Sequence, residues 1–256
     1  MRKLTLLLLF TILSIVLWAQ HLEQQAQQPP LHSSQNPDKQ IITGAERTEI
    51  YLPLLEGKRV AICGNQSSLI GKTHLVDSLI SRKVNVVKIF SPEHGFRGNA
   101  EAGAHISSST DSKTGLPIIS LYGKNKKPTA EQMKGIDLII FDIQDVGCRF
   151  YTYISTLHYV MEAAAENNVD VLILDRPNPN GYFVDGPVLE EKYKSFVGMH
   201  PIPVVHGMTI GEYGMMIVGE KWLKDSVVCQ LQVISMENYD HTMRYSLPIA
   251  PSPNLQ

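Results

Sequence analysis

The sequence predicts an α/β fold in which a mostly parallel β-sheet carries helices on both faces. Short segments that are apolar almost throughout alternate with segments whose apolar residues recur at helical spacing. Such continuous apolar strands are typical of parallel sheets, because a strand covered on both faces by helices has no polar side. Polar side chains then gather directly after the apolar segments, where open parallel sheets bind their ligands.

The predicted elements follow one another from residue 59 onward. Strands are predicted over 59–64, 84–90, 116–123, 136–143, 169–175, 201–207 and 227–236. Helices are predicted over 73–82, 129–136, 153–168 and 209–223, the last opening with Thr209 and Glu212 at the spacing of a capping box. This order indicates a Rossmann-like domain, although the chain has no GxGxxG motif for a dinucleotide.

The N-terminal residues have the features of an export signal. Arg2 and Lys3 precede an apolar run from Leu4 to Trp18, and Ala19 is a small residue suited to cleavage. We therefore expect residues 1–19 to be a signal peptide and the protein to be exported, to the periplasm or out of the cell; an uncleaved membrane anchor is the alternative. We expect a flexible polar leader over residues 20–47 and a Rossmann-like catalytic domain over 48–256.

Charge and cysteine content exclude several classes of protein. The whole chain has 23 basic and 25 acidic residues, and removing Arg2 and Lys3 with the signal peptide leaves 21 basic against 25 acidic, a balance of −4. The chain has no excess of basic residues, so its charge does not indicate binding to nucleic acid or to anionic lipid. Three cysteines without CxxC spacing argue against a disulfide framework and a structural zinc site. We expect no cofactor, and no membrane span after signal cleavage.

Residues 91–98, SPEHGFRG, place a carboxylate, an imidazole and a guanidinium at the end of a predicted strand. Pro92 restricts Ser91 to an extended conformation and stiffens the approach to Glu93. A carboxyl beside an apolar strand end has its pKa raised by desolvation, as a general acid requires. Glu93 is therefore a candidate acid, His94 a candidate proton carrier and Arg97 a candidate ligand contact. A surface carboxylate and a structural histidine are the alternatives.

The segment after the predicted strand 136–143 carries a second group of polar residues. Asp142 or Asp145 could act as the second catalytic group. Asp142 could instead be buried in a structural ion pair with Arg149. A guanidinium suits a ligand carboxylate, and tyrosine rings offer flat faces to a ring-shaped ligand. The candidate binding residues of this segment are Gln144, Arg149, Tyr151 and Tyr153.

Other segments complete the predicted rim of polar residues. The loop 175–181, DRPNPNG, is stiffened by two prolines and suits a hydroxyl-rich ligand, although turn chemistry alone would explain its Asn and Gly residues. Binding contacts are expected from Asn65, Asp175, Arg176, Asn178, Asn180 and His206. A metal site is the competing interpretation, but the sequence has neither an HExxH motif nor a His-x-His pair.

Several motifs together resemble the exo-β-N-acetylmuramidase family (DUF1343, NamZ-like glycoside hydrolases). The resemblance covers roughly residues 45–256 and rests on SPEHGFRG (91–98), FDIQDVGCRFYTYISTL (141–157), LDRPNPNG (174–181), VVHGMTIGEYGMM (204–216) and SPN (252–254). It implies an enzyme that removes N-acetylmuramic acid from the non-reducing end of peptidoglycan fragments. It also implies that Glu93 is the catalytic acid and that Arg149, Tyr151 and the rim residues bind the sugar and its lactyl carboxylate.

The resemblance also raises an expectation about domain content. Members of the family continue well beyond the SPN motif into a smaller C-terminal domain, which this sequence does not include. Glycoside hydrolysis normally requires a protonated carboxyl and a second group that acts as base or nucleophile. Asp142, Asp145 and His94 are the candidates for that second group. Two other functions remain open: an exported module that binds cell-wall sugars without catalysis, and a metal-dependent amide or ester hydrolase.

Overall fold

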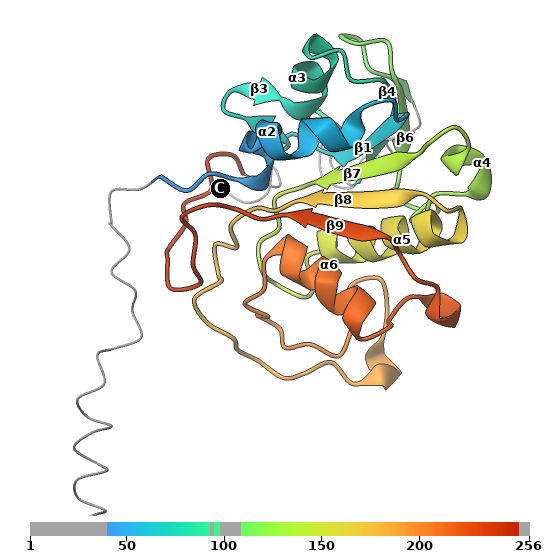
Figure 1. Cartoon of the computed structure of the whole chain (residues 1–256). Helices are drawn as coiled ribbons and strands as arrows, with labels where there is room; N and C mark the ends of the chain where they lie inside the picture. Colours follow the sequence, from blue (N-terminus) through green and yellow to red (C-terminus); the bar gives the residue numbers. More distant parts are fainter. Residues whose placement is uncertain (1–39, 93–94, 98–108, 251–256) are drawn as a thin grey trace, which may run out of the picture. The chain divides into compact units, whose positions relative to one another are not determined.

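A seven-stranded β-sheet forms the centre of the structure, a computed structural model that describes residues 40–92, 95–97 and 109–250 (Figure 1). The strand order is β5-β6-β4-β1-β7-β8-β9. All neighbours pair in parallel except β5 and β6. The strands are β1 (Val60–Gly64), β4 (Val86–Ser91), β5 (Ser109–Thr110), β6 (Pro117–Ser120), β7 (Leu138–Asp142), β8 (Asp170–Leu174) and β9 (Leu231–Ile234).

The parallel strands have the order of a Rossmann fold, so the predicted fold class is confirmed. Numbered along the chain, they lie in the order 3-2-1-4-5-6, with β1 and β7 adjacent at the centre. The chain runs from β1 to one edge of the sheet, then crosses back to β7 and runs to the other edge. The point at which the direction reverses is where doubly wound sheets bind their ligands, outside the carboxyl ends of the two strands.

Helices cover both faces of the sheet (Figure 1). One face carries α4 (Ala130–Met133), α5 (Tyr153–Glu166) and α6 (Ile210–Gly219); the other carries η1 (Gly44–Glu46), α2 (Thr48–Tyr51), η2 (Leu52–Leu55) and α3 (Leu75–Ser81). Side chains of β1 alternate between two buried clusters, with Ala61 and Cys63 facing one and Val60 and Ile62 the other. A strand buried on both faces explains the continuous apolar segments of the sequence.

The structure differs from the predicted elements at several points. Residues 201–207 form no strand; Val205 makes only isolated bridges to Cys148 and Asp185. Pro201 and Pro203 lack the N–H groups that a ladder requires. The helix predicted over 73–82 begins at Leu75, because Thr73–His74 (β3) pairs with Leu69–Ile70 (β2) in a hairpin. The last predicted helix ends at Gly219 and the last predicted strand is only β9, preceded by η4 (Lys224–Ser226).

The folded unit begins at Ile41, whereas the sequence placed its start at residue 48. The backbone of Ile42 pairs with Glu237, and Gly44 donates its N–H to the Asp175 carbonyl at 2.8 Å. A side chain at Gly44 would meet the backbone of Asp175 and Ile234, so this close approach requires glycine. The predicted signal peptide lies outside the described residues, and none of the helices that the structure describes is long and apolar enough to span a membrane.

Candidate functional site

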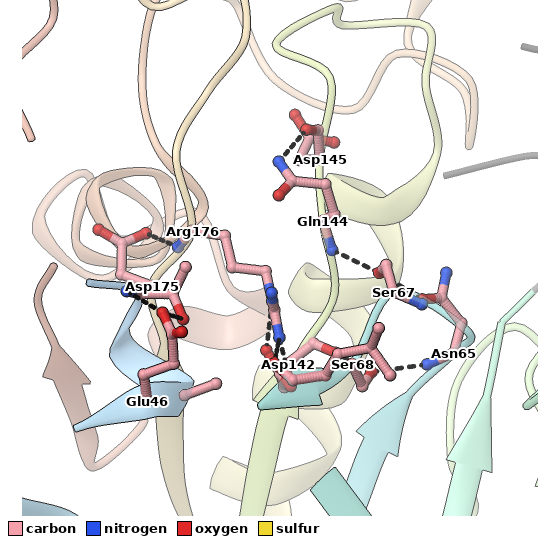
Figure 2. A network of polar contacts seen from close by, with 12 residues as sticks. Glu46, Asn65, Ser67, Ser68, Asp142, Gln144, Asp145, Asp175 and Arg176 are labelled. Atoms are coloured by element: carbon pink, nitrogen blue, oxygen red, sulfur yellow. Dashed lines mark hydrogen bonds and ion pairs between the residues drawn. The ribbon is translucent and has the colours of Figure 1, made fainter. Parts of the chain in front are cut away.

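Polar loops from three adjacent strands meet at the carboxyl edge of the sheet (Figure 2). They follow β1, β7 and β8, at the centre of the sheet and next to it. Many of the polar side chains in these loops are buried, and most of those bond to one another. The contacts that each predicted residue makes in the structure are described in turn below.

Asp142 forms a buried ion pair with Arg176. Arginine Nε and Nη2 donate to the two carboxylate oxygens at 2.6 and 2.9 Å, and the Asp142 side chain is fully buried. Nη2 also donates to the Leu69 carbonyl. The predicted structural ion pair of Asp142 thus exists, but its partner is Arg176 and not Arg149. Asp142, a candidate for the second catalytic group, and Arg176, a candidate ligand contact, are bonded to each other in this geometry.

Asn65 is held in a network at the end of β1. Its Nδ2 donates to the Tyr153 hydroxyl at 3.0 Å, and its Oδ1 accepts from the backbone N–H and the hydroxyl of Ser67. The hydroxyl of Ser68 accepts from the Asn65 N–H and donates to the Asp142 carbonyl. Gln144 joins the network through its backbone N–H, which donates to the Ser67 hydroxyl at 3.0 Å. These bonds tie the β1 loop to the β7 loop.

The side chain of Gln144 links the β7 loop to the β8 loop. Its Nε2 donates to the carbonyls of Asp145 and Pro177 at 2.8 and 2.7 Å. Both Gln144 and Asn65 are almost completely buried. The structure therefore gives these two predicted ligand contacts a positioning role, because their donors already have partners inside the protein.

Asp145 and His206 form a second buried pair, with a different character. Asp145 Oδ2 accepts from the Gly147 N–H at 2.8 Å and lies 3.7 Å from His206 Nε2. Asp145 Oδ1 and His206 Nε2 have no hydrogen-bond partner among the described residues. Because Nδ1 of the histidine accepts from the Met208 N–H, the neutral ring carries its proton on Nε2, toward the aspartate.

Desolvation changes the pKa values of this pair. Burial raises the pKa of Asp145 to about 7 and lowers the pKa of His206 to about 4. Among the described residues, no cation pairs with the carboxylate to offset the cost of charging it, since burial keeps the histidine itself neutral. At neutral pH Asp145 is therefore poised between its two protonation states, as groups that transfer protons are.

Asp175 connects the end of β8 to the start of α6. Its Oδ2 accepts from the Thr209 hydroxyl at 2.9 Å, and its Oδ1 accepts from the backbone N–H groups of Gly211 and Arg176. A Cβ atom at Gly211 would approach the Asp175 carboxylate to 2.8 Å, so the helix start can come this close only with glycine. Burial raises the pKa of Asp175 to about 6. Its oxygens serve the fold, which corrects its predicted role as a ligand contact.

Asn178 and Asn180 fasten the β8 loop to its neighbours. Asn178 Nδ2 donates to the Met208 carbonyl, and Asn180 Nδ2 donates to the Val146 carbonyl, both at 2.8 Å. Gly147 has a φ of +75°, and a Cβ atom there would lie 2.2 Å from the Asn178 side chain. Asn178 Oδ1 also accepts from the Asn180 N–H at 2.8 Å, which is the turn chemistry noted as the alternative for DRPNPNG, while the Asn180 side chain bonds a neighbouring loop.

Arg149 is the predicted contact whose charge remains uncompensated. Its Nη1 donates to the carbonyls of Pro187 and Ile202, and no carboxylate among the described residues pairs with it. Tyr151 lies nearby in sequence, with its ring edge-on to Tyr153 at a centroid distance of 5.0 Å. A half-buried guanidinium bonded only to neutral carbonyls is suited to receive an external carboxylate.

Arg97 lies in a separate ion cluster. It donates two bonds to Asp111, at 2.7 and 2.8 Å, and two more to Asp77 on α3. Lys113 adds a further bond to Asp77 at 2.6 Å. The bonds from Arg97 lower the pKa of Asp111 to about 2. Arg97 is therefore an anchor for the end of its motif, which corrects its predicted role as a ligand contact.

Glu93 and His94 lie outside the described residues. Within the ranges that are described, no three His, Cys, Asp or Glu side chains come close enough together to bind a metal ion. Cys148 is half-buried, and burial together with the nearby Asp145 raises its thiol pKa, which disfavours the reactive thiolate.

Sequence reasoning missed a buried polar chain that lies behind His206. Tyr213 on α6 hydrogen-bonds His200 Nδ1 at 2.8 Å, and His200 Nε2 bonds His158 Nδ1 at 3.0 Å. The Tyr213 ring packs against His206 at a centroid distance of 5.3 Å. These residues are distant in sequence, so no local pattern predicts them. Ser67 and Ser68 were also missed, although their place directly after β1 was a usable signal.

Comparisons with known proteins identify relatives along most of this fold. Residues 60–256 match the family model described as exo-β-N-acetylmuramidase NamZ, N-terminal. The peptidoglycan β-N-acetylmuramidase NamZ of Bacillus subtilis (strain 168) is 46% identical over 214 residues, which are 80% of this chain and 50% of that protein.

Two crystal structures of DUF1343 family proteins from Bacteroides fragilis have the same fold. One has a TM-score of 0.78 at 52% identity and covers 85% of this chain and 57% of its own. The other has a TM-score of 0.75 at 44% identity and covers 82% of this chain and 53% of its own. The chain thus spans about half the length of the relatives it matches.

Proposed function

Because this chain belongs to the family of NamZ N-terminal domains, we propose that its protein hydrolyses the β-glycosidic bond of N-acetylmuramic acid at the non-reducing end of peptidoglycan fragments. The observation that carries the proposal is the similarity to a peptidoglycan β-N-acetylmuramidase, at 46% identity over 80% of the chain. The carboxyl edge of the Rossmann-like sheet, with its uncompensated Arg149 and poised Asp145, supports the same assignment.

We propose Glu93 as the general acid of this reaction. It follows the last residue of β4, Ser91, by two positions, and β4 is the direct neighbour of β1. Its motif also ends in Arg97, which is fastened by two aspartates. A carboxyl at the end of a buried strand suits protonation of the leaving oxygen.

Asp145 fits the role of the second titrating group better than Asp142. The Asp142 carboxylate is neutralised by Arg176 in a two-bond ion pair, whereas the Asp145 carboxyl has a pKa near 7 and an oxygen without a partner among the described residues. His206 places its Nε2–H beside Asp145, where it can orient the carboxyl as a neutral hydrogen-bond donor. Arg149 and Tyr151 are proposed to receive the lactyl carboxylate and the sugar ring.

Turnover of a chromogenic β-N-acetylmuramide tests this proposal. The full-length product of the gene should release N-acetylmuramic acid, and Glu93→Gln should lose at least about a hundredfold in kcat, because Gln keeps the shape and removes the proton. Activity that survives Glu93→Gln would reject Glu93 as the acid. Retained sugar binding without turnover in the wild type would instead favour a binding module, and loss of activity with a chelator would favour a metal-dependent hydrolase.

Export is proposed from the N-terminal residues alone. Cleavage after Ala19 removes Arg2 and Lys3 together with the apolar run, and mass spectrometry of the protein purified from its host would detect the new N-terminus. An intact Met1 in a membrane fraction would identify an anchor instead.

A further inference from the structure

Arg244 is an exposed arginine with no acidic partner among the described residues. Arg47, Arg59, Arg97 and Arg176 each pair with at least one carboxylate. Arg244 instead stacks on an aromatic ring, with its Cζ 4.7 Å from the centroid of Tyr182. Stacking covers the face of a guanidinium and leaves the N–H groups at its edge available.

The residues around Tyr182 are fixed to the carboxyl edge of the sheet. Gly181 lies between Tyr239 and His241, where a Cβ atom would approach the Tyr239 hydroxyl to 2.4 Å. On the other side, Val184 Cγ2 lies 2.9 Å from the position of a Cβ atom at Gly207, directly after His206. The segment 181–184 is thus packed against the loop that carries His206. Arg244 is held on a rigid support beside the candidate site.

Exposed apolar side chains lie beside the Tyr182 ring on which Arg244 stacks. Phe183 lies 4.8 Å from Tyr182 between ring centroids and is 37% exposed, and Val184 is 62% exposed. The carboxylate of Glu212 is paired with His241 at 2.8 Å. A guanidinium edge next to exposed apolar side chains matches a lactyl group, which combines a carboxylate with a methyl branch.

We propose that Arg244, oriented by Tyr182, binds the carboxylate of a second muramic-acid unit on the leaving side of the glycan. This inference rests on the proposed function and extends it, because Arg149 would bind the unit that is released and Arg244 a unit further along the chain. The enzyme would then prefer fragments that contain two muramic acids over fragments that contain one.

The test compares KM for two substrates of defined length. One is the trisaccharide MurNAc-GlcNAc-MurNAc, and the other is the disaccharide MurNAc-GlcNAc, which lacks the second carboxylate. Arg244→Gln should raise KM for the trisaccharide about 5- to 10-fold more than KM for the disaccharide, with kcat changed little. Tyr182→Leu keeps the charge and loses the support, so we expect a smaller rise in the same direction.

Arg82→Gln is the matched control. Arg82 also lacks an acidic partner in the described part of the chain, and it donates only to Ser78 at the end of α3, on the opposite edge of the sheet. This variant should leave the ratio of the two KM values unchanged.

The possible outcomes separate the two proposals. Equal effects of Arg244→Gln on both substrates, or none on either, would overturn the second-carboxylate subsite while leaving the hydrolase assignment standing. Wild-type protein that hydrolyses neither substrate would reject the hydrolase assignment. Direct binding of the trisaccharide, measured by calorimetry at two salt concentrations, would then still report on Arg244, since its contribution should weaken as salt rises.

Discussion

Two aspartates of the same loop, Asp142 and Asp145, lie three residues apart and have opposite environments. Asp142 is fully buried and receives two bonds from Arg176. Asp145 is almost as deeply buried, but it faces a neutral His206 and leaves one oxygen without a partner among the described residues. Burial alone therefore does not determine the state of a carboxyl. The partner matters as well: Asp142 has a guanidinium within hydrogen-bond distance, whereas Asp145 has only a neutral imidazole beside it, and burial raises its pKa.

The difference separates structural from chemical residues at this edge. The Asp142–Arg176 pair joins the β7 and β8 loops and also holds the β2 strand through the Leu69 carbonyl. Among the described residues, the Asp145–His206 pair makes no further ion pair, and burial raises the pKa of its carboxyl to about 7. Two aspartates three residues apart thus differ in whether a counter-charge holds them.

Removal of Arg176 should give the largest effect. Arg176→Met would leave the Asp142 carboxylate buried without a counter-charge, and we expect the free energy of unfolding to fall by about 3–5 kcal/mol. Urea unfolding followed by circular dichroism measures this loss. Arg59→Met provides the control, because the Arg59–Asp137 pair is largely exposed and its loss should cost far less stability.

A second variant distinguishes the effect of the unpaired charge from that of a packing defect. Asp142→Asn combined with Arg176→Met removes both charges, so it should be less destabilised than Arg176→Met alone. A double variant as unstable as the single one would show that packing around Arg176, and not the charge on Asp142, carries the effect.

Asp145→Asn should have a smaller effect that depends on pH. The pKa of Asp145 is raised to about 7 in the fold, from an ordinary value of 3.8, so folding favours the protonated form. That contribution to stability is present in full below pH 3.8 and is lost as the pH rises through about 7. Asn remains neutral throughout, and we expect its stability relative to wild type to rise by about 1–3 kcal/mol between pH 5 and pH 8.

Asp185→Asn is the control for this pH dependence. Asp185 bonds the N–H of the following glycine at 2.7 Å, much as Asp145 bonds Gly147, but it is exposed. The same substitution at this exposed position gives the baseline with which the pH dependence of Asp145→Asn is compared. An Asp145→Asn difference that does not change between pH 5 and pH 8 would mean that water reaches the carboxyl and that the pair with His206 is not poised.

The fold could be predicted from the sequence because a parallel strand that is buried on both faces is almost continuously apolar. β1, β7 and β8 are apolar apart from Asp142 at the end of β7 and Asp170 at the start of β8, and polar residues follow them, so the sheet and its polar edge were predictable. The segment 201–207 misled the prediction because its apolar residues alternate with prolines, which occupy extended positions without pairing.

The partners at the edge could not be predicted from the sequence. Asp142 and Arg176 are 34 residues apart, so the sequence suggested Arg149, which lies close to Asp142 along the chain, as the partner. Likewise, the bonds of Asn65, Gln144 and Asn178 are made between loops of different strands. The sequence predicts where polar residues come together. Which of them hold the loops in place and which remain available to a ligand depends on contacts between loops.

Arg97→Gln should have the smallest effect of these variants, and it tests whether Arg97 supports the fold or contacts the ligand. Its sequence motif favoured a ligand contact, whereas the structure surrounds it with Asp77 and Asp111. Because the cluster is partly exposed, Arg97→Gln should cost about 1 kcal/mol of stability at low salt and less in 0.5 M salt, where surface charges are screened within roughly 4 Å. Thermal unfolding at the two salt concentrations measures both values. A variant with unchanged stability and a raised KM would instead show that Arg97 contacts the ligand, as its sequence motif suggested.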